Sequence, residues 1–288
     1  MPRIIVTTDF SVSSYNALKY ACSFTNVGGY NEVLLLNVFS IPGAYSAEGV
    51  SLVAVNESMA ANENRLKEEI SWVEEMHPDC KITYKETTGD FVESLKQQIV
   101  EENASLVVLG APNGYGDVWL WDTDILNAVT HLPVPVLTVP PAAEYKHIGN
   151  IAFACILENV NGATPLGVIK QLAKQTGAKL HIVTVVLPGG DDKAANEGEA
   201  LLHEMLEGFE TEYYKIYDAH VVAAIGDFIN RNHIDLLFVQ PRKHGIWHNL
   251  FHKSYAKELA KLNLIPVLAL PCIKTGNPAK KEVLQTQA

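Results

Sequence analysis

PVLTVP at residues 135–140 and PVLALP at residues 266–271 are two copies of one apolar segment in this sequence. SLVVLGAP at residues 105–112 and DLLFVQPR at residues 235–242 form a second matched pair upstream of them. The copies in each pair lie about 130 residues apart, and a period of that length exceeds the repeats of solenoid proteins. The sequence therefore predicts a duplicated domain.

Short apolar or β-branched runs, each of the length of a buried strand, recur in the same order in both halves of the chain. In the first half they are residues 3–8, 32–39, 81–86, 105–109 and 134–139. In the second half they are residues 150–156, 179–186, 213–217, 235–239 and 265–270.

Helices are expected between these strands. In the first half, apolar residues recur at helical spacing in residues 13–26, 57–76 and 89–103, and Asp90 is a candidate N-cap. Strands that alternate with helices indicate βαβ crossovers and a parallel sheet. The predicted fold class is α/β, with two tandem Rossmann-like domains that each contain a five-stranded parallel sheet flanked by helices.

The expected domain boundaries follow from the last strand of the first repeat. Pro140 and Pro141 end that strand, so the first domain is expected at residues 1–141 and the second at residues 148–273. Residues 274–288 are polar and lack periodicity, which is typical of a flexible tail.

The composition limits the classes of partner. The chain has 288 residues, of which 48% are hydrophobic and 19% charged, and its formal net charge is -11. An acidic protein repels phosphate backbones and anionic lipid, so neither nucleic acid nor a membrane is an expected partner. The first apolar run ends at Asp9, which is too short for a secretion signal or a membrane span.

The cysteines indicate a reducing compartment. Cys22, Cys80, Cys155 and Cys272 form no CxxC pair and lie far apart in the sequence. We expect buried thiols in a cytoplasmic protein.

A ligand of an open parallel sheet binds beyond the carboxyl ends of the strands, where the strand order reverses. In the first half, residues 8–11 (TDFS) and 110–116 (GAPNGYG) follow the first and fourth strands. The glycines would let the backbone approach a phosphate, and Asp9 would accept hydrogen bonds from a ribose or base. Alternatively, the glycines only shape a turn and Asp9 only caps the first helix. GxxxxGK[ST] is absent, and no GxGxxG follows the first strand, which argues against a P-loop NTPase and a dinucleotide dehydrogenase.

Together, Asp9 and Ser11 after the first strand, LLNV at residues 35–38, the glycine-rich loop and the PVL strands resemble the universal stress protein family. The resemblance covers nearly the whole chain, twice. It implies two domains of the adenine nucleotide alpha hydrolase type and a stress-response or signalling module. It also implies ATP or AMP as the ligand of the first domain.

Nucleotide-binding members of the family carry a G-x2-G-x9-G-[ST] loop that holds the phosphates, and an Asp and a Val that hold the nucleoside. Asn113 replaces the second glycine of this loop, and Asp122 replaces the last. A carboxylate close to a triphosphate is repulsive by ~1 kcal/mol or more, unless a bound Mg²⁺ reverses the sign. The site residues that the resemblance implies are Thr8, Asp9, Val38, Gly110, Asn113, Gly114, Gly116 and Thr123.

The second domain departs further from this pattern. Gln240 and Lys243 take the first two glycine positions, and the first strand ends in Ile156 without an Asp. We expect no nucleotide in this domain.

No catalytic or metal-binding set can be identified. His244, His248 and His252 have the spacing of one helix face, but Lys243 and Lys253 nearby would repel a dication, so no metal site is expected. No serine or cysteine lies in a nucleophile motif. Binding is favoured over catalysis, and the alternatives are a slow ATP hydrolase and an interaction or chaperone-like protein that binds no nucleotide.

The last strand of each domain, at residues 134–139 and 265–270, is apolar on both sides and needs a cover at its exposed edge. In universal stress proteins the corresponding strand commonly meets its counterpart across a twofold axis. We therefore expect the two strands to pair within one chain, as an intramolecular pseudo-dimer. This arrangement leaves a further homodimer open.

Overall fold

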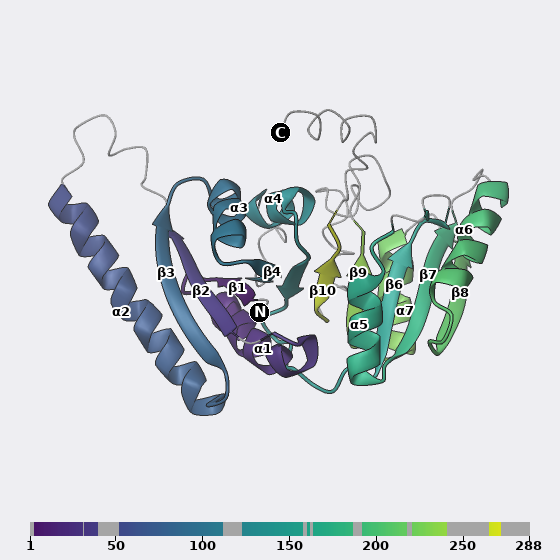
Figure 1. The fold of residues 1–288 in the computed structure, drawn as a ribbon, viewed down its shortest axis with the longest axis horizontal. Helices are drawn as coiled ribbons and strands as arrows, with labels where there is room; N and C mark the ends of the chain where they lie inside the picture. Colours follow the sequence, from purple (N-terminus) through teal and green to yellow (C-terminus); the bar gives the residue numbers. More distant parts are fainter. Residues whose placement is uncertain are drawn as a thin grey trace, which may run out of the picture.

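The protein is a three-layer α/β structure in which helices cover both faces of one sheet (Figure 1). The computed structural model describes residues 3–30, 32–39, 52–111, 123–157, 160–161, 164–186, 192–217, 221–240 and 265–271. The predicted α/β fold class is confirmed.

Strands and helices alternate along the first half as predicted. The elements are β1 (Arg3–Thr7), α1 (Val12–Gly28), β2 (Glu32–Phe39), α2 (Leu52–Met76), β3 (Lys81–Thr88), α3 (Phe91–Glu101), β4 (Ala104–Gly110), α4 (Thr123–His131) and β5 (Val136–Val139). The second half repeats the order. Its described elements are β6 (Asn150–Cys155), α5 (Gly167–Thr176), β7 (Lys179–Val186), α6 (Asp192–Met205), β8 (Thr211–Tyr217), α7 (Val221–Arg231), β9 (Leu236–Val239) and β10 (Val267–Ala269).

Local capping explains where α1 and α3 begin. The Ser11 hydroxyl accepts a hydrogen bond from the Ser14 amide at 3.2 Å and caps α1. The carboxylate of Asp90 accepts from the Glu93 amide at 3.0 Å, which confirms Asp90 as the N-cap of α3. Ser11 is thus the N-cap of α1, and Asp9 accepts a hydrogen bond from the Ser11 amide just before this helix.

Both halves have the same strand order. The sheet runs β3-β2-β1-β4-β5-β10-β9-β6-β7-β8, so each half reads third, second, first, fourth, fifth from its outer edge. The registers also agree, because Ile4 pairs with Val33 and Leu106 as Ile151 pairs with Leu180 and Leu236. The duplication inferred from the sequence is thus matched strand by strand.

The two halves join through β5 and β10, which pair antiparallel with Leu137 opposite Leu268. The Thr138 hydroxyl adds a hydrogen bond to the carbonyl of Val267 at 3.2 Å. The expected pairing of the two last strands is confirmed, and we call this strand pair the seam.

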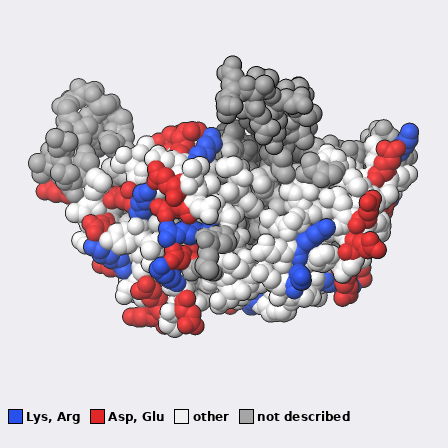
Figure 2. Space-filling view, in the orientation of Figure 1, with Lys and Arg blue, Asp and Glu red and all other residues white. Residues whose placement is uncertain are grey.

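In Figure 2, charged side chains lie mostly over the outer parts of both halves, and the centre of this face carries few of them.

One apolar core covers each face of the sheet, and each core draws residues from both halves. The first core packs α1, α2, α5 and α6 against the sheet, and the second packs α3, α4 and α7. Leu137 and Leu268 belong to the first core, and Val136 and Ala269 to the second. The seam is therefore buried from both sides.

A histidine lies buried near the start of β7. His181 is 4% exposed, and its ring packs on Tyr214 and Phe228. Within the described part of the chain, its Nδ1 has no hydrogen-bond partner, and the Glu212 carboxylate is 3.8 Å away. Burial lowers the pKa of His181, with partial opposition from the charge of Glu212.

Leu137→Lys would place a charge inside the seam, so we expect it to lower the free energy of unfolding by about 3 kcal/mol or more. Urea denaturation followed by circular dichroism measures this loss. Val100→Lys, at a position in α3 that is 79% exposed, is the control and should change stability by less than about 0.5 kcal/mol. Adding Leu268→Glu should restore part of the loss, because the two charges would then face each other. If Leu137→Lys is as mild as the control, the halves are held together elsewhere.

Acidification should destabilise the protein through His181. The unfolded histidine, with a pKa of about 6.5, takes up a proton between about pH 7.5 and 5.5, whereas the folded, desolvated ring resists protonation. We expect His181→Phe, which keeps the aromatic packing, to lose less stability than the wild type when the pH falls from about 7.5 to 5.5. Denaturation series at the two pH values measure this difference. His147→Gln, at an exposed histidine between the halves, should behave like the wild type. Equal losses in wild type and His181→Phe would contradict this origin of the pH dependence.

Candidate functional site

The strand order of the first half reverses beside β1. The chain passes from β1 outward to β2 and β3 and then returns to β4 on the other side of β1. The carboxyl ends of β1 and β4 therefore flank the crevice in which open α/β sheets bind ligands. Thr8 and Asp9 follow β1 at this edge, and Gly110 ends β4.

Residues 8–11, which follow β1, form a tight turn held by polar side chains. The Thr8 hydroxyl accepts from the Phe10 amide at 2.9 Å, and the Asp9 carboxylate accepts from the Ser11 amide at 3.0 Å. This turn holds Phe10 at a φ of 64°, in the left-handed region that is costly for a residue with a side chain. The Arg65 guanidinium lies 3.9 Å from the centre of the Phe10 ring and covers it.

Asp9 is the exposed carboxylate of this turn. Desolvation raises its pKa, but hydrogen bonds with Ser11 and Ser14 outweigh that effect and hold the pKa below its ordinary value. Asp9 is thus ionised at neutral pH and serves as a hydrogen-bond acceptor at the carboxyl edge of β1.

A second carboxylate lies behind the turn. Glu69 of α2 is only 6% exposed and accepts a hydrogen bond from the Thr8 hydroxyl at 3.0 Å. Burial raises the pKa of Glu69, against the Thr8 hydrogen bond and the charge of Arg65. Thr8 also lies 3.1 Å from the Ser14 hydroxyl, so its side chain connects β1 with both α1 and α2. Thr8 therefore holds the turn in place and does not project into solvent.

The end of β2 contributes an amide and an apolar side chain. Asn37 donates through Nδ2 to the Thr8 carbonyl at 2.8 Å, and its Oδ1 is buried without a partner among the described residues. Val38 is half-buried and packs against the second core, on the face of the sheet that α3, α4 and α7 cover. The ends of β1 and β2 thus bring Thr8, Asp9 and Val38 to one edge of the sheet, and their role in nucleotide binding stays a prediction.

Gly110 has a packing reason to be glycine. A Cβ at this position would lie 2.5 Å from the Ser13 carbonyl carbon and 2.7 Å from the Ser14 nitrogen. The first turn of α1 therefore packs directly on the end of β4, and only glycine permits that approach. The expectation that this glycine serves phosphate binding stays a prediction.

The remaining predicted residues divide into two groups. Asn113, Gly114 and Gly116 lie outside the described residues. Thr123 is the first residue of α4, on the crossover from β4 to β5, so the N-terminus of α4 lies at the carboxyl edge of the strands.

The corresponding edge of the second half has different residues. By strand register, Cys155 and Thr184 take the places of Thr8 and Asn37, with Sγ and Oγ1 3.8 Å apart. A Cβ on Gly198 of α6 would lie 2.0 Å from the Leu157 carbonyl oxygen, so α6 packs directly on the residues after β6. Counted back from the ends of their helices, Gly198 takes the position of Glu69.

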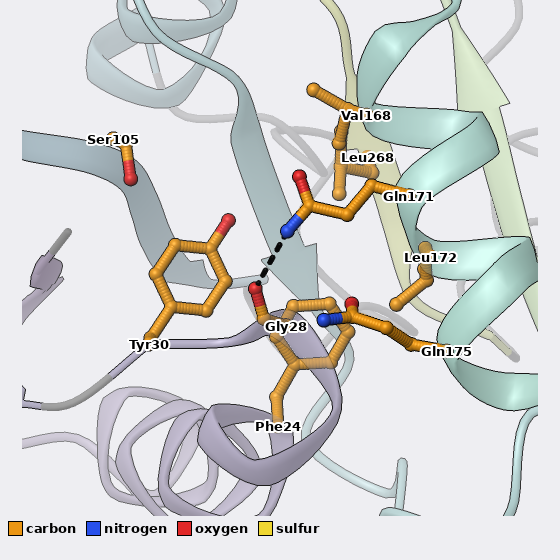
Figure 3. A pocket seen from close by; sticks show the side chains of 9 residues that line it. All are labelled: Phe24, Gly28, Tyr30, Ser105, Val168, Gln171, Leu172, Gln175 and Leu268. Atoms are coloured by element: carbon orange, nitrogen blue, oxygen red, sulfur yellow. Dashed lines mark hydrogen bonds between the residues drawn. The ribbon is translucent and has the colours of Figure 1, made fainter. Parts of the chain in front are cut away.

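A separate pocket of about 240 Å³ lies between the halves (Figure 3). Its walls come from α1 and α5, and the Gln171 side chain donates to the Gly28 carbonyl across it at 3.2 Å. Leu268 of the seam also lines it. None of the predicted site residues lies in this pocket. His244, His248 and His252 are outside the described residues, within which no three metal-ligating side chains gather.

Sequence reasoning missed Ser14, Asn37 and Glu69, which hold the turn after β1. Asn37 was visible within LLNV, but the hydrogen bond to the preceding strand requires the β1–β2 register. Glu69 follows exposed Lys67 and Glu68, and only the packing of α2 distinguishes it from them.

Comparisons with known proteins identify one matching family and several solved structures with a similar fold. The model of the universal stress protein family matches residues 1–140. A crystal structure of a universal stress protein from Archaeoglobus fulgidus DSM 4304 is 19% identical, with a TM-score of 0.70 over 93% of this chain and 98% of that chain. A functionally unknown protein from Pseudomonas aeruginosa PAO1 is 17% identical, with a TM-score of 0.57 over 94% of this chain and 92% of that chain.

A universal stress protein in complex with cAMP is 17% identical, with a TM-score of 0.35 over 49% of this chain and 98% of that chain. None of the curated proteins matches the sequence. No helix within the described ranges has the length and hydropathy to span a membrane. Residues 1–140 of this chain therefore belong to the universal stress protein family, and the chain as a whole has the fold of the Archaeoglobus member.

Proposed function

We propose that this protein is a stress-response or signalling module that binds an adenine nucleotide, ATP or AMP, in its first half only. The observation that carries the proposal is the exposed, ionised Asp9 at the carboxyl end of β1, beside the reversal of strand order. A carboxylate there accepts hydrogen bonds from ribose hydroxyls or a base amine.

The strained turn supports the same site. Phe10 has a positive φ, and the hydrogen bonds that the Phe10 and Ser11 amides donate to the side chains of Thr8 and Asp9 hold it there. Strain of this kind concentrates at ligand sites. Buried Glu69 and Asn37 fix the turn from behind, so Asp9 is presented to a ligand with little conformational freedom.

The phosphates would lie toward the N-terminus of α4. Unpaired backbone N–H groups and the helix dipole favour an anion at such an end. Thr123 begins this helix. In this proposal Asn113, Gly114 and Gly116 complete the phosphate loop, and Val38 packs against the nucleoside.

The second half lacks the groups on which this site depends. Cys155 and Thr184 replace Thr8 and Asn37, and α6 packs on the Leu157 carbonyl. We infer that this half contributes the other side of an intramolecular pseudo-dimer, which further dimerisation would extend. The thiols of Cys22, Cys80 and Cys155 are buried and form no disulfide among the described residues, which supports a cytoplasmic location.

Asp9→Ala should weaken binding of ATP and AMP by about tenfold to a hundredfold, because a charged hydrogen bond contributes roughly 1.5–3 kcal/mol. Isothermal titration calorimetry of the full chain measures the affinities. Asp79→Ala, at an exposed carboxylate in the turn between α2 and β3, is the matched control and should bind like the wild type.

Equal affinity of Asp9→Ala and wild type would remove Asp9 from the site. Absence of binding by the wild type would instead favour an interaction or chaperone-like protein with no nucleotide.

A further inference from the structure

The pocket between the halves lies at the edge of the sheet opposite the candidate nucleotide site. α1 begins beside the turn after β1, where Ser11 caps it, and it ends in this pocket at Gly28. Tyr30 precedes β2 and Ser105 lies near the start of β4, so the pocket is at the amino ends of these strands. It is therefore a separate place for a ligand. The second half contributes Val168, Gln171, Leu172, Gln175 and Leu268 to its lining (Figure 3).

Aromatic and aliphatic side chains form the apolar wall of the pocket. Phe24 is 2% exposed, and its ring lies 6.2 Å from the ring of Tyr30, with an angle of 29° between their planes. The Tyr30 ring packs on the backbone of Gly28, where an added Cβ would lie 2.1 Å from Cε2 of Tyr30. Leu172 and Leu268, both buried, line the pocket from the second half. Rings and methyl groups held in this way favour a flat apolar ligand.

Two glutamines of α5 provide the polar side of the pocket. Gln171 and Gln175 are one helical turn apart and exposed, and Figure 3 shows both side chains directed toward the end of α1. The Gln171 amide donates to the Gly28 carbonyl. The Gln175 amide nitrogen would lie 3.2 Å from a Cβ on Gly29, the C-cap of α1, and this amide forms no hydrogen bond within the described part of the chain. Gln175 can therefore both donate to a ligand and accept from it.

The helix ends determine which charge the pocket favours. α1 ends at Gly28 and α5 ends at Thr176, so the C-terminal ends of both helices lie at the pocket. A helix C-terminus carries roughly half a negative charge. Burial raises the pKa of Tyr30 to about 12, so its hydroxyl stays protonated, and none of the described residues that line the pocket is charged. An N–H or ammonium group is therefore favoured here, and a carboxylate is disfavoured.

We propose that this pocket binds a small planar aromatic molecule with an N–H or ammonium group, of the class of indole and tryptamine. Its volume of about 240 Å³ exceeds the roughly 150 Å³ of a cavity that holds benzene, which gives room for a bicyclic ring. The ring lies against Phe24 and Leu172, and the amide oxygen of Gln175 accepts its N–H. Because both halves line the pocket, the bound molecule stabilises the contact of α1 with α5.

Isothermal titration calorimetry of the full chain with indole, tryptamine and indole-3-acetate tests the proposal. The three probes share one ring system and differ in charge. We expect tryptamine to bind at least as tightly as indole, and indole-3-acetate to bind about fivefold more weakly than indole or worse, because its carboxylate faces two helix C-termini. An excess of ATP should leave the affinity for indole unchanged, because the nucleotide site is at the other edge of the sheet.

Variants of α5 locate the bound probe. Gln175→Ala should weaken indole binding by about threefold to tenfold, because it removes one hydrogen bond. Lys174→Ala, at the neighbouring exposed position, is the matched control and should bind indole like the wild type. Val168→Phe should weaken binding by more than about tenfold, because the larger side chain fills the pocket, and circular dichroism checks that this variant folds.

Indole affinity that stays at the wild-type value in both Gln175→Ala and Val168→Phe would overturn the proposal, because the probe would then bind elsewhere. Competition by ATP would also overturn it, since it would place indole at the carboxyl edge of the first half. Failure of indole and tryptamine to bind at millimolar concentration, or tighter binding of indole-3-acetate, would contradict it directly.

Discussion

The antiparallel pairing of β5 with β10 is the interaction on which the rest of the structure depends. Without it, each five-stranded sheet would end in an apolar edge strand. Leu137 and Leu268 face one core, and Val136 and Ala269 face the other, so both cores continue across the seam. Each half therefore completes the core of its neighbour, and we expect the two halves to unfold together rather than as independent units.

The shared topology makes the difference between the two carboxyl edges informative. Register places Thr8 and Asn37 in the first half where Cys155 and Thr184 lie in the second. In the first half, the buried carboxylate of Glu69 accepts a hydrogen bond from Thr8 and so fixes a strained turn. In the second half, Gly198 takes the corresponding position and lets α6 pack on the Leu157 backbone. Burying a carboxylate is costly, and the position of Glu69 behind exposed Asp9 supports a turn shaped for a ligand.

The fold could be predicted from the sequence because apolar strands, a capped helix at Asp90 and the repeated PVL segments are local signals that agree with one another. The site could be predicted only in part. Asp9 follows the first strand directly, and its position needs no tertiary information. The burial of Glu69 behind the turn after β1 arises from the packing of α2, which periodicity does not resolve. The glycine at position 110 shows a further limit of sequence-based site prediction. The close approach of α1 to the end of β4 already requires glycine there, without any ligand.

The central claim is that nucleotide binds in one half of a duplicated structure. Hydrogen–deuterium exchange of the full chain, measured with and without saturating ATP, tests it most directly, because it reports on both carboxyl edges in one sample. We expect slower exchange in peptides that contain Asp9 and Gly110, and unchanged exchange in peptides that contain Leu157 and Gln240. Protection of the second set, or equal protection of both, would contradict it.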